Sequence, residues 1–144
     1  VVANKSFQEL VSQVTGVLSL MLGAIAGVSL FVGGVGIMNI MLVSVTERTP
    51  EIGLRKAIGA TPQAILAQFL VESIILSVSG GLIGTAIGIS GVAIVGVLTP
   101  LQPSVPIVAI ALAVGISGGV GLIFGVVPAR RAAQLDPIIA LKNS

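Results

Sequence analysis

Residues 17–45 read VLSLMLGAIAGVSLFVGGVGIMNIMLVSV, and no position in this stretch carries a charged side chain. An apolar α-helix needs about 20 residues to cross the ~30 Å hydrocarbon core of a bilayer. The stretch therefore predicts a transmembrane helix. Outward from it, the charge-free interval between Glu9 and Glu47 holds 37 residues, and a second interval between Glu72 and Arg130 holds 57. The first interval fits one span and the second fits two.

The second interval is expected to turn at residues 99–106, TPLQPSVP, because three prolines in seven positions cannot continue a helix. Pro128 is expected to mark the exit of the third span. The sequence thus predicts an all-α membrane protein with three transmembrane helices and a short cytoplasmic helix between the first two. The predicted segments are an external stalk helix at 1–16, spans at 17–46, 73–98 and 107–128, a cytoplasmic loop and helix at 47–72, an external turn at 99–106 and a cytoplasmic tail at 129–144.

The composition excludes most enzyme chemistry. The 144 residues are 55% hydrophobic and 8% charged, whereas soluble domains are about 25% charged. The chain contains no Cys and no His, so a cysteine nucleophile, a thiolate metal site and a histidine base are all excluded. We therefore expect no catalytic residue, no metal and no cofactor on this chain. The basic residues have no stacking aromatics beside them, which argues against nucleic acid as a partner.

The first helix is predicted to run from about Ser6 to Val45, about 60 Å at 1.5 Å per residue, which exceeds the bilayer core. Its beginning would then form an external stalk, the alternative being an amphipathic helix lying flat on the interface. Orientation follows from the basic residues, which favour the cytoplasmic side. Lys5 lies alone on one side of the spans, and six residues lie on the other: Arg48, Arg55, Lys56, Arg130, Arg131 and Lys142.

Glycines recur at four-residue spacing in all three spans, and such spacing lets helix backbones approach closely. The pattern predicts tight helix packing, either within the chain or between two copies, at Gly23, Gly27, Gly80, Gly84, Gly88, Gly115, Gly119, Gly121 and Gly125. The spans contain no ionisable side chain, which argues against an ion or proton pathway. Asn39 is expected to form a helix-to-helix hydrogen bond rather than part of a substrate site.

The loop between the first two spans carries two helix start signals. Thr49 is a candidate N-cap with Pro50 after it, and Gly59 is a candidate stop, so a helix is predicted over residues 50–58. Glu51 and Arg55 suit its two ends and lie four residues apart. Thr61 and Pro62 then repeat the start signal. This short helix is either a solvated connector or a rigid element that docks into a cytoplasmic partner.

Residues 33–60, GGVGIMNIMLVSVTERTPEIGLRKAIGA, resemble the signature of the FtsX-like permease superfamily. The tail residues PARRAA at 128–133 and LDP at 135–137 are also similar to that family, nearest to its macrolide-exporter branch of MacB-like proteins. The resemblance implies four spans with a large external domain after the first, of which this chain matches the last three. It also implies a coupling helix that docks on an ATPase. Its residues here would be Glu47, Arg48, Thr49, Pro50, Glu51, Ile52, Gly53, Leu54, Arg55, Lys56, Ala57 and Gly59.

The resemblance further implies a function. The chain would be the membrane portion of an ABC-type exporter that transmits ATP-driven motion of a cytoplasmic ATPase to an external domain. Alternatives are a regulatory subunit controlling an external hydrolase or sensor, and a lipoprotein-release permease. No phosphate-binding motif G-x-x-x-x-G-K-[ST] occurs, so ATP and Mg would be bound by a partner subunit or a fused domain.

The expected setting is the bacterial inner membrane, with a multi-pass homodimer and a periplasmic adaptor as further partner. In the predicted cytoplasmic tail, Asp136 is a candidate helix cap with Pro137 at the first helical position. Arg130 and Arg131 would contact anionic lipid or the ATPase, or simply anchor the topology.

Overall fold

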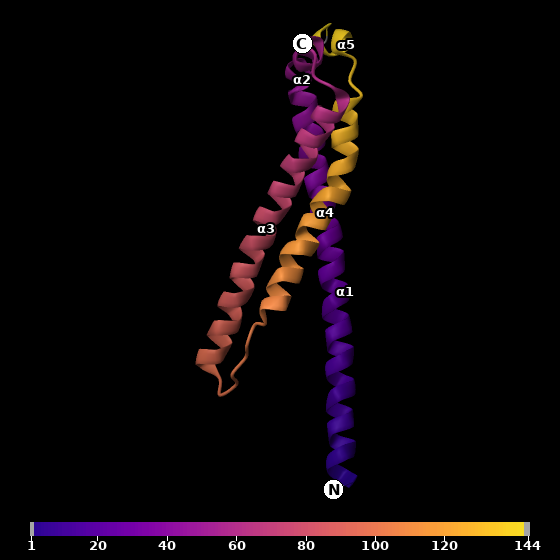
Figure 1. Ribbon diagram of the computed structural model, residues 1–144. Coiled ribbons are helices and arrows are strands. Elements are labelled where there is room, and N and C mark those ends of the chain that lie inside the picture. Colours follow the sequence, from indigo (N-terminus) through magenta and orange to yellow (C-terminus); the bar gives the residue numbers. More distant parts are fainter. Residues whose placement is uncertain (1, 143–144) are drawn as a thin grey trace. The chain divides into compact units, whose positions relative to one another are not determined.

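The computed structural model describes residues 2–142, with side chains described over residues 2–139. Residues 1, 143 and 144, which belong to the predicted stalk and tail, lie outside this part. The described chain forms five helices: α1 (Val2–Glu47), α2 (Thr49–Ala57), α3 (Pro62–Leu98), α4 (Ile107–Ala133) and α5 (Pro137–Lys142) (Figure 1). The predicted all-α class is confirmed.

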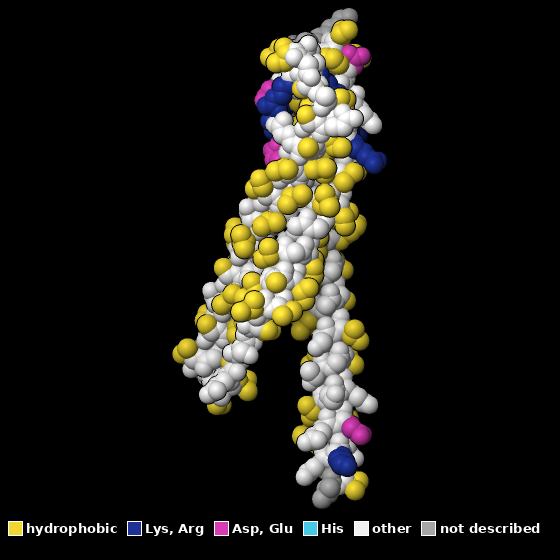
Figure 2. Space-filling model, in the orientation of Figure 1, with side chains coloured by type: hydrophobic (Ala, Val, Ile, Leu, Met, Phe, Trp, Pro, Cys, Tyr) yellow, Lys and Arg dark blue, Asp and Glu magenta, His cyan; other side chains and the backbone are white. Residues whose placement is uncertain are grey.

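Three of these helices, α1, α3 and α4, are long and apolar enough to cross a membrane by length and composition. The predicted number of membrane-spanning helices is therefore confirmed by length and composition, and the bounds of the spans stay predictions. Large apolar side chains on them lie open to the surroundings, among them Ile83 of α3 at 62% exposure and Ile123 of α4 at 68%. Figure 2 shows such side chains along α3 and α4. A surface of this kind suits contact with lipid.

The chain divides into two compact units, Val1–Gly33 and Gly34–Ser144. The first unit is the beginning of α1, where Lys5, Gln8 and Glu9 share one polar face. α1 has no break near residue 16, where the predicted stalk meets the predicted span. That the first part stands outside the membrane stays a prediction. The second unit contains every contact described below.

The buried core of the second unit lies around α2. Phe69 of α3 is fully buried at its centre, and the Ala129 side chain of α4 is equally inaccessible. The core is completed by Met41 and Val45 of α1, Ile52 of α2, Ile65 of α3 and Ala132 of α4. Four helices therefore meet at this end of the unit, and the core holds α2 against the ends of the three long helices.

The third long helix extends past Pro128, the predicted exit of the third span. α4 continues through Pro128 to Ala133, and the point where the span leaves the membrane stays a prediction. A proline inside a helix removes one backbone hydrogen bond and costs about 3 kcal/mol. Here Pro128, Ala129 and Ala132 are all buried, and this packing offsets the cost and keeps the last turn helical.

α3 and α4 pack closely through small residues. At Gly121, an added Cβ would lie 2.8 Å from the backbone oxygen of Ser73, and at Gly125 it would overlap the Ser73 side chain. Two further glycines make close approaches that spacing did not single out: Gly34 against Phe124 and Gly81 against Ser117. The tight packing predicted at Gly121 and Gly125 therefore occurs within the chain.

The other predicted packing glycines have open space around them within the described residues. Apart from chain neighbours and the helix's own backbone, no heavy atom of the second unit lies within 4 Å of a Cβ built at Gly80, Gly84, Gly88, Gly115 or Gly119, and none of the first unit lies that close at Gly23 or Gly27. Asn39 is exposed, and its amide makes no hydrogen bond to another described residue. The helix-to-helix hydrogen bond predicted for Asn39 is therefore not made between the described helices.

Candidate coupling site around α2

The chain passes from α1 into α2 through a single residue, Arg48. The Arg48 N–H donates to the Ser44 carbonyl at 2.9 Å, and the Arg48 carbonyl accepts from the Ile52 N–H at 3.0 Å. The Thr49 hydroxyl donates to the Val45 carbonyl at 2.9 Å, four residues back. The prediction that Thr49 caps α2 is therefore wrong. Because α2 follows α1 almost directly, the hydroxyl finds an acceptor in α1 and does not turn toward the N–H groups of α2.

The C-terminal end of α2 follows the sequence prediction. Gly59 has a φ of 114°, a backbone conformation that glycine adopts without the steric cost of a Cβ. Its N–H donates to the Lys56 carbonyl at 3.1 Å, and the Ala60 N–H donates to the Arg55 carbonyl at 2.9 Å. This pair of bonds is a Schellman motif, which satisfies the last carbonyls of a helix.

The beginning of α3 also follows the prediction. The Thr61 side chain accepts a hydrogen bond from the Ala64 N–H at 3.1 Å, and Pro62 occupies the first turn. Thr61 is therefore an N-cap. The turn between α2 and α3 is consequently short and has a defined helix end on each side.

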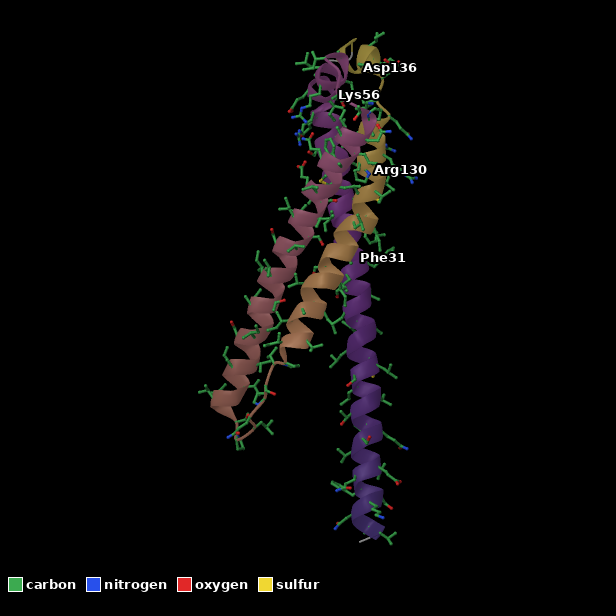
Figure 3. All side chains as sticks on the ribbon, in the orientation of Figure 1. Phe31, Lys56, Arg130 and Asp136 are labelled. Carbon is green, nitrogen blue, oxygen red and sulfur yellow. The ribbon has the colours of Figure 1, made fainter. Side chains whose placement is uncertain are left out.

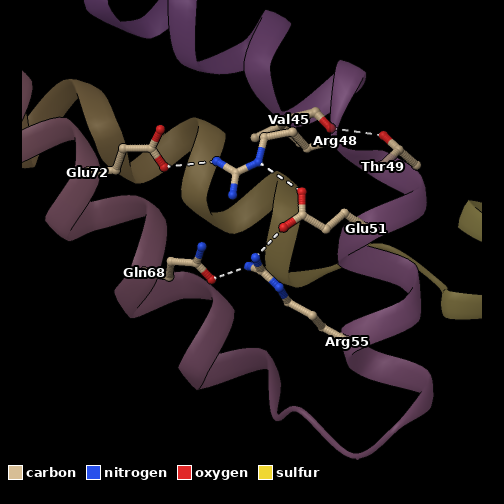
Figure 4. A network of polar contacts seen from close by, with 7 residues as sticks. All are labelled: Val45, Arg48, Thr49, Glu51, Arg55, Gln68 and Glu72. Carbon is tan, nitrogen blue, oxygen red and sulfur yellow. Dashed lines mark hydrogen bonds and ion pairs between the residues drawn. The ribbon is translucent and has the colours of Figure 1, made fainter.

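Arg48 connects α2 to α3 (Figure 4). Its guanidinium pairs with Glu51 of α2 at 3.5 Å and with Glu72 of α3 at 3.2 Å. It also lies over the Phe69 ring, 5.3 Å from the ring centroid. A planar guanidinium can make ion pairs at its edge while its face stacks on an aromatic ring. Arg48 thus joins the end of α1, the first turn of α2 and the end of the predicted cytoplasmic part of α3.

Arg55 makes a second connection between the same helices. Its guanidinium forms an ion pair with Glu51, one turn earlier in α2, and donates to the Gln68 side chain of α3 at 2.6 Å. The predicted pairing of Glu51 with Arg55 is confirmed. Figure 4 shows these side chains lying between the two helices. The charged residues of α2 therefore contact the rest of the chain, and they fix the position of α2.

Lys56 connects α2 to the other end of the sequence. Its ammonium donates to the backbone carbonyls of Ala133 and Leu135, the second at 2.6 Å. Burial lowers the pKa of Lys56, and the nearby Asp136 carboxylate acts in the opposite direction. Asp136 also accepts from the Ile138 N–H at 2.9 Å, which confirms it as the cap of α5 with Pro137 at the first position. Figure 3 shows Lys56 and Asp136 at the same end of the unit.

One face of α2 remains open. Ile52 and Gly53 are buried, whereas Leu54 is 53% exposed and Ile58 is 79% exposed. Ala57 between them is exposed as well. Ile58 was absent from the predicted coupling residues, although its position four residues after Leu54 places both on one helix face. The open face of α2, together with Ile58 just after its last residue, therefore presents large apolar side chains next to the exposed Glu51. It lies at an end of the unit where charged side chains gather (Figure 2).

The remaining predicted site residues lie at the edges of this region. Glu47 ends α1 and is exposed, and Pro50 lies in the first turn of α2. Arg130 and Arg131 in the last turn of α4 are exposed and form no ion pair among the described residues. The structure brings together Arg48, Glu51 and Arg55, but it leaves the arginine pair of α4 apart from them.

Comparisons with known proteins agree on one family. The model of the FtsX-like permease C-terminal family matches residues 23–137. An ABC transporter permease, YknZ of Bacillus subtilis, is 49% identical over 132 residues, which cover 92% of this chain and 33% of that protein. Macrolide export ATP-binding/permease proteins MacB are similar too. The one from Chlorobium luteolum is 55% identical over 135 residues, covering 94% of this chain and 20% of that protein.

Another MacB, from Wolinella succinogenes, is 51% identical over 139 residues, covering 96% of this chain and 21% of that protein. The chain thus spans about a fifth to a third of the length of these relatives. The matched part is the one that contains the three apolar helices and α2.

Proposed function

This chain belongs to the FtsX-like permease family, and on that premise we propose that it is the membrane portion of an ABC-type exporter. In this proposal α2 is the coupling helix, which receives movement from a cytoplasmic ATPase. The long helices pass that movement to an external domain. The similar MacB proteins carry names that join an ATP-binding part to a permease part, and this chain has no phosphate-binding motif of its own.

The observation that carries the proposal is the way α2 is built. It is fixed to α3 by Arg48 and Arg55 and to the end of α4 by Lys56. Its open face presents Leu54 and Ile58 outside the apolar spans. A solvated connector would need neither the fixed position nor the apolar face. A rigid helix with an exposed apolar face is suited to docking in a groove of a partner.

The transmission step follows from the same contacts. α2 is held by side chains from the ends of all three long helices, so a displacement of α2 acts on all of them together. The spans themselves carry no ionisable residue, which favours a mechanical role over a polar path through the bilayer. The six basic residues on the α2 side favour a cytoplasmic position for α2. The glycines with open space around them supply faces for a second copy.

The docking claim is tested in the full-length permease with its ATP-binding protein or domain. Leu54→Asp and Ile58→Asp place a charge on the open face of α2, where it would have to be buried in the partner. Each is expected to weaken ATPase association at least tenfold, measured by cross-linking and by the permease-dependent rate of ATP hydrolysis.

Leu101→Asp is the matched control, because Leu101 is equally apolar and 64% exposed but lies in the turn at the other end of the spans. Membrane insertion and expression of all three variants are compared with the wild type. Leu54→Asp and Ile58→Asp variants that bind the ATPase as well as Leu101→Asp does would overturn the proposal.

A further inference from the structure

Lys56 joins segments that are far apart in the sequence. Its two acceptors, the carbonyls of Ala133 and Leu135, lie 77 and 79 residues further along the chain. Ala133 is the last residue of α4, and Leu135 lies in the short link to α5. α2 and α5 also pack against each other. The Lys56 side chain therefore acts at the place where the chain leaves α4 and begins α5.

The Lys56 ammonium supplies hydrogen-bond donors to backbone carbonyls at the end of α4. The last carbonyls of a helix have no partner within the helix, and a cation near them is favourable for the helix dipole as well. The Gln134 N–H donates to the Arg130 carbonyl at 3.0 Å and the Leu135 N–H to the Ala132 carbonyl at 3.4 Å, which ends α4. Lys56 binds the carbonyls that follow. It thereby fixes the direction in which the chain leaves α4.

The helix that starts there carries exposed apolar side chains. Ile138 of α5 is 75% exposed and Ile139 is 56% exposed, although α5 lies against α2. Leu54 and Ile58 on the open face of α2 have comparable exposure. Both short helices thus leave large apolar side chains open at the charged end of the unit, beyond the three long apolar helices.

We propose that Lys56 is the positioning residue that holds α5 beside α2, and that the two helices form one apolar docking surface for the ATP-binding partner. This proposal rests on the proposed function, because it enlarges the surface assigned there to α2. The partner would need an apolar groove that accepts Ile138 together with Ile58. Lys56 acts on the partner only through the place that it gives to α5.

The test is a double-mutant cycle in the full-length permease, with affinity for its ATP-binding protein or domain as the readout. Ile138→Asp is expected to weaken binding about tenfold, because the charge would be buried in the partner. Lys56→Met removes the ammonium and is expected to weaken binding to a similar degree. In the double variant, Ile138→Asp should have little further effect, because α5 has already left the surface. Lys56→Arg keeps donors for both carbonyls and should restore most of the affinity.

Two controls separate this role from a general loss of structure. Lys5→Met makes the same chemical change on an exposed lysine of the first unit and should leave affinity unchanged. Thermal unfolding in detergent shows whether Lys56→Met keeps its fold, and if it does not, the cycle is run with Lys56→Gln in its place.

Wild-type affinity in the Ile138→Asp variant would show that α5 is not part of the docking surface. Additive effects in the double variant would show that Lys56 does not position α5. Either result overturns this inference while leaving α2 as the docking helix. If Leu54→Asp also binds normally, the proposed function fails as well.

Discussion

At the scale of single residues, the contact between α3 and α4 depends on the absence of side chains. Ser73 is fully buried and Ser77 is 7% exposed, and their hydroxyls donate to the Leu70 and Ser117 carbonyls. With the hydroxyls satisfied by backbone, the two serines offer little bulk to the facing helix. Gly121 and Gly125 then bring the α4 backbone against them. Such close approach is a principal source of helix association in lipid.

Gly121→Ala is expected to destabilise the protein by about 1–3 kcal/mol, the usual cost of overpacking. The new methyl group would lie 2.8 Å from the Ser73 backbone oxygen and 3.1 Å from the Ile74 Cα, and backbone atoms cannot move aside easily. Thermal unfolding in detergent, followed by circular dichroism, measures the change. Gly119→Ala in the same helix has open space and should unfold at or slightly above the wild-type temperature. Equal unfolding temperatures for the two variants would contradict the packing described here.

At the scale of elements, α2 and α3 begin in different ways although their sequences look alike. Both starts have threonine followed by proline, at Thr49 and at Thr61. Only Thr61 caps its helix. It follows the turn that contains Gly59, and its side chain accepts a hydrogen bond from the Ala64 N–H in the first turn of α3. Thr49 stands directly behind α1 and donates to Val45. The same dipeptide therefore stands at the start of both helices, but only at Thr61 does the threonine side chain cap the helix.

Thr61→Ala should cost about 1 kcal/mol, which is typical for the loss of an N-cap. Thr49→Ala should cost only about a few tenths of a kcal/mol, because a threonine hydroxyl that bonds the carbonyl four residues back adds little stability, and here it caps no N–H group of α2. The comparison is made by thermal unfolding of both variants under identical detergent conditions. A larger loss in Thr49→Ala than in Thr61→Ala would restore the sequence-based assignment of Thr49 as a cap.

At the scale of the whole molecule, the sequence predicts the long helices better than the contacts between them. The spans follow from charge-free intervals, and the ends at Gly59, Thr61 and Asp136 follow from local signals that need only neighbouring residues. The contacts of Arg48 with Glu72 and of Lys56 with Leu135 join distant segments, so no local pattern indicates them. Glycine spacing likewise indicates candidate packing positions, but it does not indicate which of them face a neighbouring helix.

The orientation of the chain in the membrane remains a prediction that labelling can test. The chain has no cysteine, so single cysteines at Ile58 and Gln102 can be labelled without background. Ile58 lies beside the basic residues of α2, and Gln102 lies in the turn between α3 and α4. A membrane-impermeant thiol reagent should reach Gln102→Cys in intact cells and Ile58→Cys only after the membrane is opened. Labelling of both in intact cells would contradict the orientation.

The core around Phe69 also has a consequence for the order of assembly during synthesis. Met41, Val45 and Ile52 are made early, yet the core that buries them includes Ala129 and Ala132 of α4. The carbonyl that Lys56 binds in Leu135 is made 79 residues after Lys56 itself. At a synthesis rate of about 5–20 residues per second, that interval lasts roughly 4–16 s. During this time α2 lacks its contacts with the end of α4 and with Leu135, so this end of the molecule reaches its final packing last.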